Sequence, residues 1–183
     1  ASMLVGYFSY DIIRLIEKIP NKCKKDIDIP DIRLIRPKFL IIYDNIKKKI
    51  FYIRNVFEDE DINNYYLKYR SIKNRFQELK NFGKIKLPEN FHRNKKKVKI
   101  KTNISKTNFK KIVLKAKNYI KRGDIFQVVL SQRFETKLTK TPLEIYKKLR
   151  TTNPSPFMFF FNFEDFQIIG SSPEILVRLR KNK

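Results

Sequence analysis

The fold is decided by one stretch, which reads Gly123-Asp124-Ile125-Phe126-Gln127-Val128-Val129-Leu130-Ser131-Gln132-Arg133-Phe134. Its glycine and aspartate favour a turn, and the residues after them are predicted to form one strand. Side chains alternate between the two faces of a strand, so one face carries only apolar residues: Phe126, Val128, Leu130 and Phe134. The other face carries Gln127, Ser131 and Arg133 among Ile125 and Val129. This pattern predicts the wall of a polar cleft.

The length and composition of the chain indicate a globular protein. A chain of 183 residues can form one large domain or two small ones around a hydrophobic core, and 42% of its residues are hydrophobic. No segment approaches the roughly 18 consecutive apolar residues of a membrane span, so no membrane is expected as a partner. The single cysteine, Cys23, cannot form an internal disulfide, which predicts a cytoplasmic location.

The formal net charge of +24 raises the alternative of a basic nucleic-acid-binding module. The basic residues are mostly lysines and are spread through every segment together with many isoleucines and asparagines, as the codons of an AT-rich genome would supply. No aromatic ribonucleoprotein pattern and no metal finger accompanies them. We therefore expect no nucleic acid as partner.

The first part of the chain predicts strands and helices in mixed order. The expected elements are a strand (4–10), a short helix (12–19), an irregular segment (21–37), a hairpin of two strands (39–43 and 50–53) turning at Asp44-Asn45, and a long helix (59–82). Residues 84–104 show no sustained period and are expected to be a surface linker. A domain boundary is therefore predicted after residue 104, between 1–104 and 105–183.

The second part predicts helices alternating with hairpins. A helix is expected from about residue 105 to Arg122, ended by Gly123, and a second helix from the capping box at Thr141 to about residue 150. Strands are expected at 157–163 and 166–169, joined by a turn, and at 174–180. Helices alternating with hairpins rather than with single parallel strands indicate an α+β fold with largely antiparallel sheets and packed helices.

Two further stretches could carry chemistry. Glu174 follows Gly170-Ser171-Ser172-Pro173 at the head of an expected strand. Burial at such a place raises the pKa of a carboxyl group, which could then donate a proton near neutrality, although a solvated carboxylate is the alternative. The tract Asn153-Pro154-Ser155-Pro156-Phe157-Met158-Phe159 combines rigid prolines with aromatic side chains. It could frame a flat apolar ligand, or it could be core packing after a helix.

Taken together, these three stretches closely resemble the large subunit of anthranilate synthase (component I), a member of the chorismate-utilising enzymes. Leu4-Val5-Gly6-Tyr7-Phe8-Ser9-Tyr10-Asp11 resembles part of the N-terminal region of that family. The resemblance implies that residues 1–104 belong to the N-terminal region and its linker. It also implies that 105–183 begin the chorismate-binding domain, an α-β-β-α sandwich.

The resemblance implies a lyase of tryptophan biosynthesis that converts chorismate and ammonia to anthranilate and pyruvate. Glu174 corresponds to the general acid that helps the C4 hydroxyl of chorismate to leave. Gln127 stands where water-using relatives carry a lysine. A lysine can act as a base toward water, whereas ammonia needs only to be oriented, so Gln127 indicates an ammonia user. Pro156, Phe157 and Met158 correspond to the tract that contacts tryptophan, the feedback inhibitor.

The resemblance also implies Mg²⁺ as cofactor and a glutamine amidotransferase subunit (component II) as the source of ammonia. The glutamates that bind Mg²⁺ lie in the C-terminal half of the family, so no metal ligand is predicted here. The chain is accordingly expected to be an internal piece of the subunit, inactive by itself. Aminodeoxychorismate synthase component I, which also uses ammonia, is the nearest alternative within the family.

Overall fold

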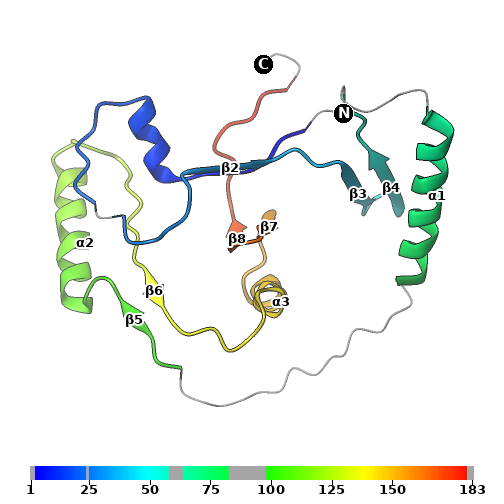
Figure 1. The fold of residues 1–183 in the computed structure, drawn as a ribbon. Helices are drawn as coiled ribbons and strands as arrows, with labels where there is room; N and C mark the ends of the chain where they lie inside the picture. The colour runs from blue at the N-terminus through cyan, green and yellow to red at the C-terminus, as the bar shows by residue number, and fades with distance from the viewer. Residues whose placement is uncertain (1–2, 24, 58–63, 83–97, 181–183) are drawn as a thin grey trace. The chain divides into compact units, whose positions relative to one another are not determined.

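The computed structural model describes residues 3–23, 25–57, 64–82 and 98–180 of the chain. It divides into two compact units, Ala1–Asn90 and Phe91–Lys183. Most of the predicted linker, residues 84–104, lies outside the described residues. The assignment of 1–104 and 105–183 to two family regions stays a prediction. Each described sheet has two strands, and both strands run antiparallel, so the prediction of an antiparallel α+β fold is confirmed (Figure 1).

The first unit begins with β1 (Val5–Phe8), the 3₁₀ helix η1 (Tyr10–Leu15) and β2 (Ile32–Ile35). β1 pairs with β2, and Tyr7 Oη donates a hydrogen bond to the Pro30 carbonyl at 2.7 Å. Two sequence predictions are corrected here. The short helix expected at 12–19 is a 3₁₀ helix at its start only, and β2 lies inside the segment expected to be irregular. β2 has only four residues, so its sequence carries little period to detect.

The second sheet of this unit is the predicted hairpin, β3 (Phe39–Asp44) with β4 (Lys49–Arg54). Asp44 Oδ1 accepts hydrogen bonds from the backbone N–H groups of Ile46 and Lys47, both at 2.9 Å, which closes the turn. α1 (Tyr65–Phe82) packs beside β4. The helix predicted over 59–82 is therefore confirmed from residue 65, and its expected first turns fall partly outside the described residues.

The second unit starts with β5 (Lys101–Thr102), α2 (Lys106–Lys121) and β6 (Phe134–Glu135). Ser105 caps α2 by accepting a hydrogen bond from the Asn108 N–H at 3.3 Å. Gly123 ends the helix with φ 79°, a left-handed conformation that other residues adopt at a cost. The Asp124 N–H then bonds the Tyr119 carbonyl at 3.0 Å, as in a Schellman motif. The predicted helix and its glycine stop are confirmed.

The remaining elements are α3 (Pro142–Thr152), β7 (Phe157–Asn162) and β8 (Gln167–Ser172). α3 packs on the β7–β8 hairpin (Figure 1). None of the helices in the described ranges is long and apolar enough to cross a membrane.

Two predicted strands are wrong. Of the opening stretch only Phe134 is in a strand, as the first residue of β6, and residues 174–180 have no strand pairing. Most of the apolar face predicted for the opening stretch is correspondingly open to solvent: Phe126 is 93% exposed and Phe134 is 63% exposed. A strand is stable only when neighbouring strands satisfy its backbone groups. Except at the end of the opening stretch, where the Asn103 N–H donates to the Arg133 carbonyl at 3.2 Å beside β6, the described residues supply no such neighbour for either segment, although both have a strand-like side-chain pattern.

Candidate functional site

The predicted site residues are positioned mainly by the β7–β8 hairpin. In its register Phe157 lies opposite Ser172, and Met158 lies opposite Ser171. Glu174 follows the end of β8 by two residues, so the predicted acid lies beyond the same end of the hairpin at which the proline tract enters β7. The hairpin therefore brings the tract 156–158 and the chain leading into Glu174 onto neighbouring strands.

Aromatic packing holds the hairpin together. Phe163, at its turn, is 4% exposed, and its N–H donates a hydrogen bond to the Phe166 carbonyl at 3.0 Å. The rings of Phe163 and Phe166 are 5.0 Å apart, and those of Phe159 and Phe161 are 5.2 Å apart. Such pairs stabilise a fold beyond the area that they bury. The hairpin is thus fixed at its turn, and its opposite end carries the predicted site residues.

α3 is fastened to the hairpin and begins at the predicted capping box. The Tyr146 ring lies 5.8 Å from that of Phe160 on β7. The Thr141 hydroxyl accepts a hydrogen bond from the Glu144 N–H at 3.3 Å, and the Thr141 N–H donates to the Glu144 carboxylate at 2.9 Å. Pro142 occupies the first turn, where its missing N–H is not needed. The prediction of this helix start is confirmed.

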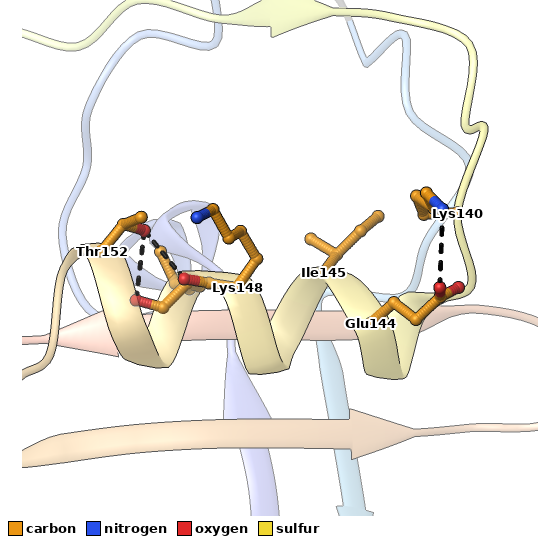
Figure 2. Close-up of a pocket in the computed structure, with 6 residues that line it drawn as sticks. Lys140, Glu144, Ile145, Lys148 and Thr152 are labelled. Atoms are coloured by element: carbon orange, nitrogen blue, oxygen red, sulfur yellow. Dashed lines mark hydrogen bonds and ion pairs between the residues drawn. The ribbon is translucent and has the colours of Figure 1, made fainter. Parts of the chain in front are cut away.

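Glu144, in the described part of the chain, has a carboxyl group with a perturbed pKa. Hydrogen bonds from the Thr141 backbone and hydroxyl favour its charged form, and Lys140 Nζ lies 3.8 Å away (Figure 2). Together they lower the pKa of Glu144 below its ordinary value. This carboxylate stabilises a helix start, and nothing in its surroundings points to catalysis.

The outer face of α3 borders a cavity of about 380 Å³. Figure 2 shows Ile145 and Lys148 projecting from the same side of the helix. The lining is completed by residues of the same helix and by the residue before its cap: Lys140, Glu144, Leu149 and Thr152. None of the predicted site residues lines this cavity.

The proline tract is anchored at its start. Ser171 Oγ donates a hydrogen bond to the Asn153 carbonyl at 2.6 Å, joining β8 to the end of α3. Pro156 and Phe157 are exposed and Met158 is half-buried, so the tract presents its predicted inhibitor-binding side chains at the surface of this unit. Ser155 Oγ is buried and has no hydrogen-bond partner among the residues that the structure describes. Sequence reasoning singled out this tract but did not assign a role to Ser171.

Glu174 is exposed, and its carbonyl accepts a hydrogen bond from Ser172 Oγ at 3.2 Å. The burial expected around a proton-donating carboxyl is not provided by the described residues. Gln127 is also exposed and lies in the segment between α2 and β6, which is not part of a strand in the described structure. The structure therefore relates Glu174 to the tract 156–158 through one hairpin, and the described residues show no hydrogen bond that joins Gln127 to Glu174 or to the tract.

The described residues do not fit a metal centre. No group of three or more His, Cys, Asp or Glu side chains in residues 3–23, 25–57, 64–82 and 98–180 is placed to hold an ion. The single described cysteine, Cys23, is free and exposed.

Comparison with known proteins decides the family. The chorismate binding enzyme family matches residues 1–183, which is the whole chain. The chain belongs to this family. It is 40% identical over 180 residues to anthranilate synthase component 1 of Acetivibrio thermocellus, covering 96% of this chain and 36% of that protein. It is 38% identical over 182 residues to anthranilate synthase component 1 of Aquifex aeolicus, covering 98% and 36%.

A solved structure gives the same result for the fold. The chain superposes on anthranilate synthase component I from Streptococcus pneumoniae with a TM-score of 0.77 and 32% sequence identity, covering 98% of this chain and 40% of that one. The resemblance to the large subunit of anthranilate synthase, first drawn from three stretches of sequence, is confirmed across the chain. This member of the family spans 36% of the length of the curated relatives quoted above.

Proposed function

We propose that the chain contributes part of the active site of an anthranilate synthase large subunit. The reaction converts chorismate and ammonia to anthranilate, pyruvate and water. One observation carries the proposal: the two family motifs at 153–158 and 170–174, separate in sequence, meet across the β7–β8 hairpin in a chain that belongs to the chorismate-binding family. The numbered component in the names of the relatives fits an enzyme with a second subunit.

Glu174 acts in this proposal as the general acid. Loss of the C4 hydroxyl from chorismate as water requires a proton, because hydroxide is a poor leaving group. A carboxyl group can supply it when its surroundings disfavour the charged form. Glu174 is exposed among the described residues, so the apolar surroundings must come from substrate or from protein outside them.

Gln127 orients ammonia in the same proposal. Its amide has a carbonyl oxygen that accepts hydrogen bonds and an NH₂ group that donates them, so it can hold a neutral nucleophile without removing a proton. A lysine at this position would instead suit the activation of water. The exposed apolar neighbours of Gln127, Phe126 and Val128, fit a segment that is covered in the working enzyme.

The remaining parts of the proposal concern ligands. Pro156, Phe157 and Met158 form part of a tryptophan site that regulates the enzyme. Mg²⁺ is bound by residues outside the described ranges and supplies charge stabilisation when present. Ammonia comes from a glutamine amidotransferase subunit. A reducing cytoplasm suits the exposed thiol of Cys23.

Product analysis tests the proposal. The whole protein, meaning this chain with any sequence encoded with it, is given chorismate, Mg²⁺ and ammonium chloride. Anthranilate is followed by fluorescence, and pyruvate by coupled oxidation of NADH. Equal amounts of the two products are expected. Aminodeoxychorismate without pyruvate would place the protein in the alternative branch of the family, and isochorismate or salicylate would contradict the role of Gln127.

A further inference from the structure

The hydrogen bond between Ser171 and Asn153 fastens a segment that has few other means of attachment. Asn153 is the last cap residue of α3, and its N–H already bonds the Leu149 carbonyl at 2.8 Å. Pro154 and Pro156 have no backbone N–H, so two of the four residues 153–156 cannot donate a backbone hydrogen bond. The carbonyl groups of the segment are therefore its more numerous points of attachment. The hydroxyl of Ser171, 2.6 Å from the Asn153 carbonyl, uses one of them.

Ser171 and Ser172 are consecutive residues that make different connections. Ser171 Oγ reaches back to the start of the tract, while Ser172 Oγ donates to the Glu174 carbonyl at 3.2 Å. Consecutive side chains on a strand point to opposite faces, which lets the two neighbours serve two partners. In the backbone register the same serines lie opposite Met158 and Phe157. The end of β8 is thus joined to the tract on one side and to Glu174 on the other.

We propose that Ser171 is a positioning residue that couples the tract 153–158 to Glu174. A ligand that seats on Pro156, Phe157 and Met158 shifts the start of β7, and β8 moves with it through the backbone pairing of Met158 with Ser171. The Ser171 hydroxyl ties the start of the tract, at Asn153, to the same movement. The segment that carries Glu174 follows, because it continues directly from β8. This inference rests on the proposed function, in which the ligand is tryptophan and Glu174 is the acid.

Replacing the hydroxyl tests the coupling in the whole protein. Ser171→Ala removes the bond, and Ser171→Thr keeps a hydroxyl on a residue that strands favour. Thr151→Ala is the matched control: the Thr151 hydroxyl also donates to a carbonyl nearby, that of Lys148 at 2.8 Å, but connects two residues of α3 only. The measurements are the tryptophan concentration for half-inhibition, kcat and KM for chorismate, and amide hydrogen exchange at Asn153, Ser155 and Phe157.

Ser171→Ala is expected to raise the half-inhibitory tryptophan concentration roughly 2- to 12-fold, the range that corresponds to one ordinary hydrogen bond. KM for chorismate should stay unchanged, and exchange at Ser155 and Phe157 should become faster. Ser171→Thr should restore the wild-type half-inhibitory concentration and the wild-type exchange rates. Thr151→Ala should change neither of these quantities.

Unchanged inhibition in Ser171→Ala, or an equal change in Thr151→Ala, would overturn the coupling. Unchanged amide exchange at Ser155 and Phe157 in Ser171→Ala would show that Ser171 does not fasten the tract, independently of the inhibition measurements. A wild-type protein that forms no anthranilate would instead refute the proposed function and the regulatory role with it. The exchange data would then still decide whether Ser171 fastens the tract.

Discussion

Gly170 is the position at which a small change should disturb the hairpin most. It lies on β8 opposite Phe159, and a Cβ added to it would overlap the Phe159 ring at Cζ, Cε1 and Cε2. The ring cannot turn away freely, because it stacks on Phe161 at a centroid distance of 5.2 Å. Overpacking of this kind typically costs about 1–3 kcal/mol. Gly170→Ala should therefore destabilise the β7–β8 pairing by that amount.

A double-mutant cycle isolates the overlap. Phe159→Leu removes the ring atoms that the added methyl group would meet, so the pair Gly170→Ala with Phe159→Leu should cost less than the sum of the two single changes, by about 1–2 kcal/mol. The free energy of local opening is measured by amide exchange across β7 and β8 in the whole protein. Gly123→Ala is the control, because no atom lies within 4 Å of its added Cβ and its cost comes from the positive φ.

The two changes should act at different places. Gly123→Ala should loosen the end of α2 and leave exchange in β7 and β8 as it was. Additive effects in the Gly170–Phe159 cycle, or full protection of the hairpin in Gly170→Ala, would refute the argument from the ring overlap.

Four further predictions concern the tract, the nucleophile and the helix cap. Met158→Thr should raise the tryptophan concentration for half-inhibition while kcat changes little; unchanged inhibition would remove Met158 from the site. Gln127→Lys should lower kcat/KM for ammonia by at least about tenfold, since a lysine suits the activation of water; full ammonia-dependent activity would refute the orienting role. Thr141→Ala should cost α3 about 1 kcal/mol in the exchange-derived opening free energy. Because the pKa of Glu144 is lowered in the folded protein, its charge stabilises the helix at pH values above the ordinary glutamate pKa of about 4.3. This stabilisation is lost as the pH falls through the lower pKa that Glu144 has in the folded state. Exchange of the first turn of α3, corrected for its intrinsic pH dependence, should show this acid sensitivity in the wild type and not in Glu144→Gln.

The elements that the sequence predicted correctly are those that depend on local contacts. The capping box of α3 needs only Thr141, Pro142 and Glu144, and the glycine stop of α2 needs only a residue that accepts positive φ. The hairpins β3–β4 and β7–β8 join strands that are close in sequence. In each case the residues that decide the structure lie within one short window.

The elements that failed depend on distant partners. Residues 125–133 and 174–180 alternate apolar and polar side chains well enough to suggest strands, but pairing needs a second strand that no local pattern specifies. The site shows the same division. The hairpin that relates Met158 to Ser171 follows from local pairing, whereas the surroundings of Glu174 and Gln127 depend on residues elsewhere.

The central claim is that Glu174 is the general acid of a chorismate-converting site, and one measurement tests it most directly. In the whole protein, kcat and chorismate binding are compared for the wild type, Glu174→Gln and Glu164→Gln. Glu164 is an exposed carboxylate at the turn of the same hairpin and serves as control. The account predicts that Glu174→Gln lowers kcat by roughly 10²- to 10⁴-fold with chorismate binding largely intact, while Glu164→Gln behaves as the wild type. Normal turnover by Glu174→Gln would contradict it.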